Sequence, residues 1–243
     1  KLVDLIKQNG GNVLFNTKIK SVISKKKEIV INYKGNESTF DLVVNCAGLQ
    51  SDRVFKNLTK LKRPVRIIPF RGEYMSFKDE YKDMVNHLVY PVPNPKFPFL
   101  GVHFTRMING DREVGPNAVL ALEREGYKNT DFSLTDTIDS LSYVGLHNFV
   151  KSNFRFALGE FASSLSEKSF IKKAKQMMPE IDSIMLKKGG AGVRAQALNP
   201  EGQLLMDFRV EKIDNQIHVL NAPSPGATAS LAIASHIIKN YIK

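Results

Sequence analysis

Residues 221–235 read Asn-Ala-Pro-Ser-Pro-Gly-Ala-Thr-Ala-Ser-Leu-Ala-Ile-Ala-Ser and predict a tight turn followed by a helix of small residues. Pro225 and Gly226 stand where this helix is expected to begin, and the first backbone N–H groups of a helix have no partner within it. A helix N-terminus favours negative charge or electron-rich oxygen atoms, and small side chains allow a close approach. The stretch therefore predicts either a ligand site or a place of close packing between helix and sheet.

The segments that surround this stretch have the pattern of an α/β layer. Gly10 and Gly11 are expected to end the first helix, and Gly48 ends an apolar run that reads as a strand buried on both faces. The predicted helix is Lys1–Asn9, and the predicted strands are Asn12–Phe15, Thr17–Ser24, Glu28–Tyr33, Glu37–Phe40, Leu42–Ala47, Leu204–Phe208 and Ile217–Leu220.

The composition changes near Pro64, where short segments rich in proline, aromatic and β-branched residues begin and continue to Phe104. Two helices are predicted after them, over Ser140–Leu165 and Glu167–Met178, and the chain becomes glycine-rich from Gly189. We therefore predict a mixed α/β (α+β) fold. Residues 1–63 and 189–243 are expected to form a partial Rossmann-like layer, and residues 64–188 an inserted antiparallel-sheet cap domain. Ligands collect at such domain interfaces.

Composition and charge narrow the possible functions. The chain has 243 residues and a formal net charge of +11, without a motif typical of nucleic-acid binding. The basic surface is expected to attract a dianionic metabolite or to rest on a membrane, and no nucleic-acid partner is expected. No apolar run is long enough to span a bilayer, and the start does not read as a secretory signal. The single cysteine, Cys46, excludes an internal disulfide framework. A cytoplasmic location is expected, with possible peripheral contact at the inner face of the membrane, and no metal site is expected.

Four motif-bearing segments follow one another along the chain. They are Val43–Asp52 (VVNCAGLQSD); Ile68–Tyr74 (IPFRGEY); Asn86–Pro93 (NHLVYPVP) with Leu100–Arg106 (LGVHFTR) and Val114–Ala118 (VGPNA); and Gly189–Gln196 (GGAGVRAQ) with Asn221–Ser235. Together they resemble the FAD-dependent L-2-hydroxyglutarate oxidases and dehydrogenases of the D-amino-acid-oxidase-like superfamily. The resemblance runs over essentially the whole chain.

One element of that family is missing from the sequence. Such flavoproteins carry a Gly-x-Gly-x-x-Gly turn that holds the pyrophosphate, and this pattern occurs nowhere in the chain. Gly189-Gly-Ala-Gly192 lacks the third glycine at the required spacing. The sequence is therefore expected to be the C-terminal part of such an enzyme.

The resemblance implies an FAD site built from two turns. Gly48 would permit close backbone approach, and the turn after residue 222 would direct N–H groups at the pyrimidine edge of the flavin. Asp52 would open the next helix, with a simple N-cap as the alternative. The implied cofactor-binding residues are Asn45, Cys46, Ala47, Gly48, Asp52, Arg194, Pro223, Ser224, Pro225, Gly226, Ala227 and Thr228.

Oxidation of a 2-hydroxy acid needs cations for its carboxylates and a base for its hydroxyl proton. Arg71 and Arg194 are the candidate carboxylate ligands, with Arg106 as a third; a structural arginine is the alternative for each. His87 and His103 are the candidate catalytic bases, because neutral imidazole accepts a proton near pH 7. Tyr90 and Thr105 are expected either to hydrogen-bond substrate oxygens or to serve packing.

The expected function is oxidation of L-2-hydroxyglutarate to 2-oxoglutarate by hydride transfer to FAD, with a quinone or oxygen as the electron acceptor. One alternative is a related flavoenzyme that acts on a different hydroxy acid, an amino acid or glycerol 3-phosphate. The other is a non-catalytic binding fragment, an interpretation that the missing glycine-rich turn supports.

Overall fold

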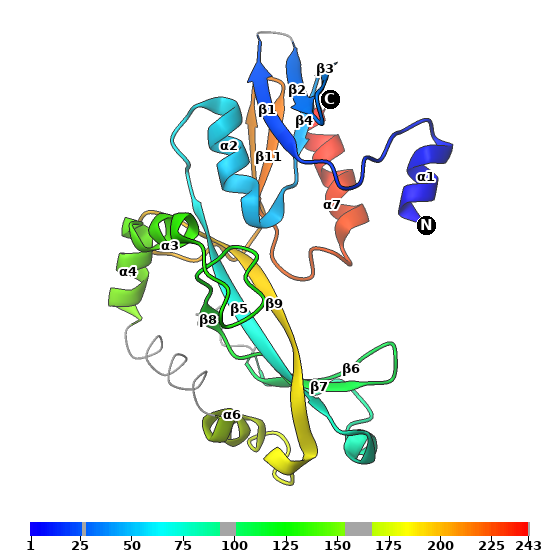
Figure 1. Ribbon diagram of the computed structural model, residues 1–243, viewed down its shortest axis with the longest axis vertical. Helices are drawn as coiled ribbons and strands as arrows, with labels where there is room; N and C mark the ends of the chain where they lie inside the picture. The colour runs from blue at the N-terminus through cyan, green and yellow to red at the C-terminus, as the bar shows by residue number, and fades with distance from the viewer. Residues whose placement is uncertain (26–27, 93–100, 154–166, 243) are drawn as a thin grey trace.

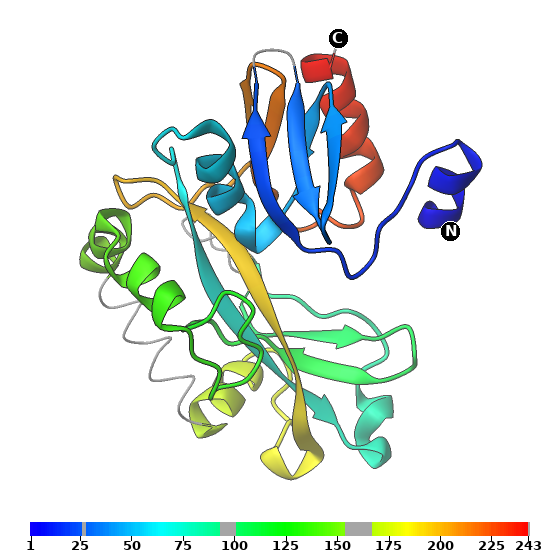
Figure 2. The same cartoon turned by 45° about the horizontal axis from the view of Figure 1, so that its top comes forward.

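The computed structural model describes residues 1–25, 28–92, 101–153 and 167–242. Figure 1 shows two layers joined by a long two-stranded ribbon, with the C-terminus in the upper layer. The first helix, α1 (Leu2–Gln8), lies apart from both layers in Figures 1 and 2 and buries none of its residues.

The upper layer contains two small sheets. One is antiparallel and has the order β1-β2-β3; the other has the order β10-β11-β4 and contains a parallel pair, β11 with β4. The elements of this layer are β1 (Ile19–Ser24), β2 (Ile29–Tyr33), β3 (Asn36–Phe40), β4 (Val43–Asn45), the 3-10 helix η1 (Gly48–Gln50), α2 (Ser51–Thr59), β10 (Arg209–Ile213), β11 (Gln216–Asn221), α7 (Ser230–Ile237) and the π-helical turn η4 (Ile238–Ile242).

Helices cover both faces of β11, because every residue of this strand is buried. Ile217 and Val219 pack with Ile237 of α7, whereas Leu220 joins Phe55 of α2 in a separate cluster. Neighbouring residues of a strand point to opposite faces, so this alternation places one helix on each side. A sheet with a parallel pair and helices on both faces confirms the predicted α/β character of the layer.

The lower layer is built on two long strands. β5 (Arg66–Phe77) pairs antiparallel with β9 (Leu186–Leu198) along nearly its whole length, from Arg66↔Leu198 to Phe77↔Leu186. The other elements are η2 (Asp79–Met84), β6 (His103–Arg106), β7 (Arg112–Gly115), β8 (Val119–Leu120), α3 (Leu134–Leu141), α4 (Val144–Ser152), α6 (Glu167–Ala174) and η3 (Ser183–Met185). β7 and β8 pair with the other edge of β5, and β6 extends the sheet beyond β7.

Two apolar clusters hold the cap sheet. At one end of the ribbon, Phe77, Phe104 and Val114 pack with Phe170 and Ile171 of α6. At the other end, Ile68 and Leu198 pack with Tyr143, Leu146 and Phe149 at the start of and along α4. Burial of each large apolar side chain stabilises the fold by roughly 1.5–3 kcal/mol, so these helices fix the orientation of the sheet.

Several predicted helices and strands have other bounds in the structure or are absent from it. Residues 12–15 are not in a strand, and no strand covers Leu204–Phe208, where Leu204 makes a single bridge to Leu198. The predicted strand at 42–47 is only β4, and it is not buried on both faces, because Val44 is 40% exposed. The predicted helix Ser140–Leu165 is divided into parts of α3 and α4 and continues into residues outside the described ranges.

The helix after residue 222 begins later than the sequence suggests. α7 starts at Ser230 rather than at Pro225, because residues 224–229 form successive turns. These turns are closed by hydrogen bonds from Gly226 N to Pro223 O (2.9 Å) and from Ala229 N to Pro225 O (2.9 Å). The small-residue turn is therefore a loop of its own in front of the helix.

Candidate functional site

The two turns predicted to contact the cofactor lie at the same edge of the upper sheet. β11 and β4 are parallel neighbours, with His218 opposite Asn45, so their carboxyl ends lie side by side. The turn after β4 contains Cys46, Ala47 and Gly48, all exposed, and the turn after β11 contains residues 222–229. In open α/β sheets, ligands bind in the crevice beyond the carboxyl ends of parallel strands.

The first turn is held from inside by Asn45. Its buried side chain donates from Nδ2 to Ser51 O at 2.9 Å and accepts at Oδ1 from Ala47 N at 3.1 Å. Gly48 has a φ of +50°, and a Cβ added there would meet no atom within 4 Å. This left-handed conformation favours glycine, and the open space above it permits close approach of another molecule.

His218 supports Asn45 from the neighbouring strand. The Asn45 amide donates to His218 Nδ1 at 3.1 Å, so His218 Nε2 carries the proton and donates to Gln216 Oε1 at 3.1 Å. The ring is 0% exposed and lies edge-on to Phe55. Desolvation by burial lowers the pKa of His218 from 6.5 to about 4, so the ring stays neutral near pH 7.

The second turn offers backbone donors. Among the described residues, no acceptor lies within hydrogen-bond reach of the Ala227 or Thr228 backbone N–H, whereas Gly226 and Ala229 donate within the turn. Ala227 and Thr228 are exposed. Open N–H donors beside a glycine that tolerates close approach fit the electron-rich edge of a flavin, so these residues suit the cofactor that the sequence predicts.

Asp52 does not reach the surface of this site. It is the second residue of α2, whose N-cap is Gln50, so the N-cap alternative is wrong. Its carboxylate is 0% exposed and accepts from Arg124 Nη1 at 2.5 Å, Arg124 Nη2 at 3.1 Å and Arg63 Nη1 at 2.8 Å. Its predicted cofactor role stays a prediction, and any effect would reach the cofactor through the turn that precedes α2.

The register of the cap sheet places the substrate candidates on two faces. Phe104, Val114 and Met75 share the face that packs into the apolar core, because Phe104 is opposite Val114 and Val114 is opposite Met75. Neighbouring residues point the other way, so His103 and Thr105 lie on the opposite face.

Arg194 shares a face with Tyr74 further along the ribbon. Arg194 is opposite Phe70, and Tyr74 follows Phe70 at an even spacing, so all three side chains point to one side. Tyr74 and Arg194 interact electrostatically; burial, opposed by the Arg194 charge, raises the pKa of Tyr74. The strand register alone thus assigns His103, Thr105, Tyr74 and Arg194 to the face of the sheet that points away from Phe104, Val114 and Met75. This face is called the substrate face below.

His103 is oriented as a proton acceptor. It is 8% exposed, its Nδ1 lies 2.9 Å from Gly101 O, and its ring lies 5.0 Å from that of Tyr90. A carbonyl oxygen only accepts, so Nδ1 carries the proton in this contact, and Nε2 of the neutral ring is left with its lone pair. The structure thus brings together three predicted residues, His103, Tyr90 and Thr105.

The other substrate candidates lie elsewhere. Arg71 is opposite Val193 and points away from Arg194; it donates to Lys128 O and Asn129 Oδ1 and lies 3.3 Å from Glu73 Oε1. Arg106 is exposed on the same side as Phe104, with Nη1 at 3.5 Å from Asn86 O, and His87 is exposed. Arg71 and Arg194 therefore leave the ribbon on opposite faces, although both line the same small hollow, and their joint role as carboxylate ligands stays a prediction.

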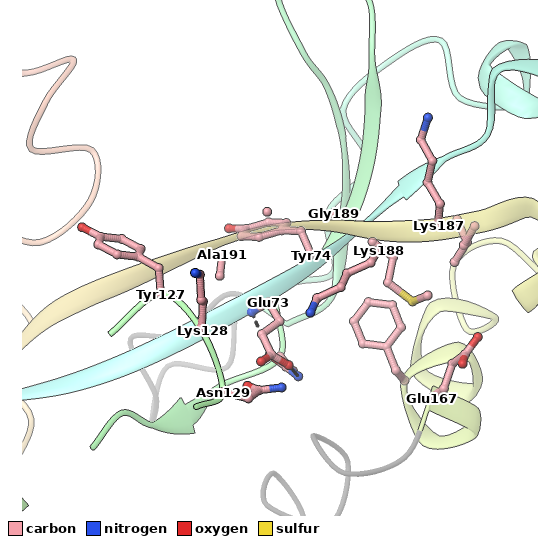
Figure 3. Close-up of a pocket in the computed structure, with 15 residues that line it drawn as sticks. Glu73, Tyr74, Tyr127, Lys128, Asn129, Glu167, Lys187, Lys188, Gly189 and Ala191 are labelled. Atoms are coloured by element: carbon pink, nitrogen blue, oxygen red, sulfur yellow. Dashed lines mark hydrogen bonds between the residues drawn. The ribbon is translucent and has the colours of Figure 1, made fainter. Parts of the chain in front are cut away.

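Two hollows border the ribbon. A space of about 660 Å³ lies between β9, α6 and residues 127–129, and its lining includes Glu73, Tyr127, Lys128 and Lys188. Figure 3 shows the Tyr74 ring and the Glu73 carboxylate pointing to different sides of the ribbon. A second space, of about 130 Å³, is lined by Tyr74, Asn117 and Arg194. The larger hollow therefore contains none of the predicted catalytic residues.

Sequence reasoning missed three residues that the structure places at or behind the site: Tyr74, Arg124 and His218. Tyr74 lies in the quoted IPFRGEY motif, but its place beside Arg194 depends on the pairing of β5 with β9, which the sequence does not give. Arg124 and His218 act through contacts of 72 and 173 residues in sequence separation, and no local pattern reveals such partners.

The chain matches the family described as FAD dependent oxidoreductase (DAO) over residues 1–239. It is 44% identical to an L-2-hydroxyglutarate dehydrogenase of Indibacter alkaliphilus over 96% of this chain and 59% of that protein. It is also 41% identical to the mitochondrial L-2-hydroxyglutarate dehydrogenase of Bos taurus over 94% of this chain and 53% of that protein. The chain thus spans a little more than half the length of these curated relatives.

Solved structures show the same fold at low sequence identity. The FAD-bound L-alpha-glycerophosphate oxidase of Mycoplasma pneumoniae superposes with a TM-score of 0.65 at 17% identity, over 96% of this chain and 52% of that one. The FAD complex of the Bacillus halodurans glycerol-3-phosphate dehydrogenase gives a TM-score of 0.54 at 12% identity, over 96% and 40%. The family match over residues 1–239 and the identity to these relatives place this chain in the FAD dependent oxidoreductase family.

Proposed function

We propose that this chain forms the substrate-binding and flavin-contacting part of an enzyme that oxidises L-2-hydroxyglutarate to 2-oxoglutarate with FAD. The observation that carries the proposal is the substrate face, where the strand register places His103, with Nδ1 held by Gly101 O, and the cation Arg194. The names of relatives at 40–47% identity support the choice of substrate. A base and a carboxylate ligand on one face are what a 2-hydroxy acid requires.

His103 is the base in this proposal. Its Nε2 accepts the hydroxyl proton of the substrate, and the Nδ1–H contact with Gly101 O fixes the ring and its tautomer. When bound, FAD supplies the two-electron acceptor for the hydride that leaves the substrate carbon. Tyr90 and Thr105 border His103 and provide hydroxyl groups for substrate oxygens. His87 is the less suitable candidate for the catalytic base, because it is exposed.

Arg194 binds a substrate carboxylate through its guanidinium fork. It is half-buried, and although burial lowers its pKa, arginine retains its charge at physiological pH. Tyr74 lies beside it and offers a phenol donor. Arg71 supports the site differently: it anchors residues 128–129 to the ribbon.

In the proposal, the cofactor is held by the exposed turns at residues 46–48 and 223–228. The Ala227 and Thr228 N–H groups would bind the pyrimidine edge and stabilise negative charge there. Asn45 does not touch the ligand but fixes the backbone of the first turn.

The test is a comparison of substrates with the native, flavin-loaded protein. We expect L-2-hydroxyglutarate to be turned over with 2-oxoglutarate as product, and the D-enantiomer, glycerol 3-phosphate and L-amino acids to be poor substrates. Efficient turnover of glycerol 3-phosphate or of an amino acid, without turnover of L-2-hydroxyglutarate, would favour the related flavoenzymes. A protein that binds no flavin and turns over none of these would support the non-catalytic interpretation.

The proposal includes peripheral contact with a membrane and a quinone as the electron acceptor. No helix within the described ranges is both long and apolar enough to cross a membrane. Lys168, Lys172 and Lys175 line a groove beside Ile171 together with Glu167 and Asp182, and the small excess of positive charge supports peripheral contact with anionic lipid. Reoxidation by a membrane quinone, rather than by oxygen, would fit that contact. Co-sedimentation with anionic vesicles, lost on Lys168→Glu and Lys172→Glu and absent with neutral vesicles, is the expected result.

A further inference from the structure

The turn between β4 and α2 forms hydrogen bonds with the cap domain as well as within its own layer. Arg124, in the connection between β8 and α3, donates from Nη1 to Leu49 O at 2.5 Å. The next residue, Glu125, accepts from Gln50 Nε2 at 3.3 Å. Two consecutive cap residues therefore contact two consecutive residues of η1, which directly follows the exposed cofactor turn at residues 46–48.

Arg124 is itself immobilised from several sides. Its side chain is 1% exposed and forms a two-pronged ion pair with the fully buried Asp52, the second residue of α2. Its Nη2 also lies 2.9 Å from Asp139 Oδ2 of α3, and its backbone N–H donates to Asp136 Oδ2 at 2.8 Å. A guanidinium fork offers fixed geometry to several acceptors at once, which an ammonium group does not.

The same connection also reaches the substrate sheet. Ala121 N donates to Pro69 O of β5 at 3.0 Å, three residues before Arg124. Further along, Lys128 O and Asn129 Oδ1 accept from Arg71 of β5. Residues 121–129 thus contact β5 at both of their ends and η1, next to the cofactor turn, in their middle.

We infer that Arg124 is a positioning residue that fixes the cofactor turn relative to the substrate face. This inference rests on the proposed function, since the distance it sets is the distance between the flavin and the substrate carbon. Arg124 touches neither ligand in this scheme; it acts through Leu49 and Asp52. Misplacement of reacting groups by about 1 Å costs roughly a hundredfold in rate, so such a contact affects catalysis without affecting binding.

Arg63 provides a matched control. It contacts Asp52 at 2.8 Å and Asp139 at 2.6 Å, as Arg124 does, but makes no contact with η1 among the described residues. Arg63→Met and Arg124→Met therefore each leave one arginine on Asp52, and only Arg124→Met releases the turn. Arg124→Lys keeps a charge beside Asp52 but cannot also reach Leu49 O in the same geometry.

The first measurement is amide hydrogen exchange of residues 45–52 in this chain, followed by mass spectrometry. The reporter is Gln50 N–H, which is bonded to Ala47 O at 2.9 Å. We expect exchange to be about tenfold faster in Arg124→Met and in Arg124→Lys than in Arg63→Met at matched thermal stability. If Arg124→Met does not fold, Arg124→Lys and the exposed-site variant Glu125→Ala carry the test, with a smaller change for Glu125→Ala.

The second measurement uses the native, flavin-loaded protein. Arg124→Lys is expected to lower kcat for L-2-hydroxyglutarate about tenfold with KM nearly unchanged, and to shift the flavin absorption spectrum, whereas Arg63→Met does neither. Equal exchange in the Arg124 and Arg63 variants, or an unchanged kcat in Arg124→Lys, would overturn the inference. If the unmodified protein does not oxidise L-2-hydroxyglutarate, the proposed function fails, and the exchange measurement still decides whether Arg124 holds the turn.

Discussion

At the scale of single residues, the choice between two histidines decides the chemistry. His103 is buried, and Gly101 O holds the proton on Nδ1, whereas His87 is exposed. We predict that His103→Asn slows flavin reduction by the native protein by roughly 10²–10⁴-fold, the contribution of a general base. Stopped-flow absorbance measures this rate. His87→Asn is the control, and an equal loss in both variants would remove His103 from its assigned role.

Arg194 and Arg71 can be separated in the same way. Arg194→Lys removes a bidentate carboxylate contact worth about 1.5–3 kcal/mol, so we predict that KM rises roughly 10- to 100-fold. Arg71→Lys instead loses internal contacts with Lys128, Asn129 and Glu73, so its main effect is a lower melting temperature. Steady-state kinetics and thermal unfolding of both variants provide the comparison; a large KM effect confined to Arg71→Lys would reverse the assignment.

The sequence predicted the residue types of the site better than their grouping. The motifs identify His103, Thr105 and Arg194, which the strand register then places on one face. They also identify Arg71, which the structure places on the other face. The motifs alone could not separate the two arginines, because they do not show how β5 pairs with β9. Asp52 was identified correctly as the start of a helix, but its partners Arg63 and Arg124 lie far along the chain and could not be inferred locally.

At the scale of elements, the ribbon of β5 and β9 carries the cap. Its register is interrupted between Glu73 and Met75, where Gly189 and Gly190 of β9 stand opposite the single residue Tyr74 of β5. The sequence suggested only a glycine-rich segment here, because glycine disfavours strands and the pairing that overrides this preference is made with β5. β9 also crosses the predicted domain boundary at residue 189, so that boundary stays a prediction.

Substitution by alanine is expected to have opposite effects on stability at the two glycines of this bulge. A Cβ on Gly189 would lie 2.7 Å from Tyr74 O, whereas a Cβ on Gly190 would meet nothing within 4 Å. We expect Gly189→Ala to lower the free energy of unfolding by about 1–3 kcal/mol, because backbone must shift. Gly190→Ala is expected to be neutral or slightly stabilising. Chemical denaturation of the two variants checks this, and equal stabilities would show that the bulge is placed wrongly.

The pairing of β11 with β4 predicts a pH dependence of stability. His218 has a pKa of about 4 when folded and 6.5 when unfolded, so between these values the unfolded chain binds more protons. The free energy of unfolding should therefore fall by up to about 3 kcal/mol as pH is lowered from 6.5 to 4, and this loss ends below pH 4.

Urea denaturation across that range measures the effect. His218→Gln should flatten the slope, whereas substitution of the exposed His236 by Gln should leave it unchanged. Asp139 affects stability only at lower pH. Burial raises the pKa of its carboxyl group, but the hydrogen bond and charge of Arg63, with the charges of Arg124 and Arg53, hold this pKa below 3.8. A slope between pH 6.5 and 4 that persists in His218→Gln would contradict the assignment.

At the scale of the whole molecule, the proposal assigns the flavin-contacting turns to the upper layer and the substrate-binding residues to the lower layer. Residues 121–129 connect the two layers, because Arg124 binds Leu49 O of η1 and Ala121 N binds Pro69 O of β5. The α/β character and the family follow from the sequence, because they depend on local pattern and motif, whereas the inserted cap domain stays a prediction. The distance between the two layers does not follow from the sequence, since it depends on Arg124, Asp52 and other long-range contacts.

The most direct test is anaerobic mixing of the native, FAD-loaded protein with L-2-hydroxyglutarate, followed by its flavin absorption band. We predict that the band bleaches in a single exponential phase, that 2-oxoglutarate forms in equal amount, and that His103→Asn slows the bleaching without abolishing substrate binding. A flavin that stays oxidised with L-2-hydroxyglutarate, or that bleaches equally fast in His103→Asn, would contradict the assignment of the substrate face.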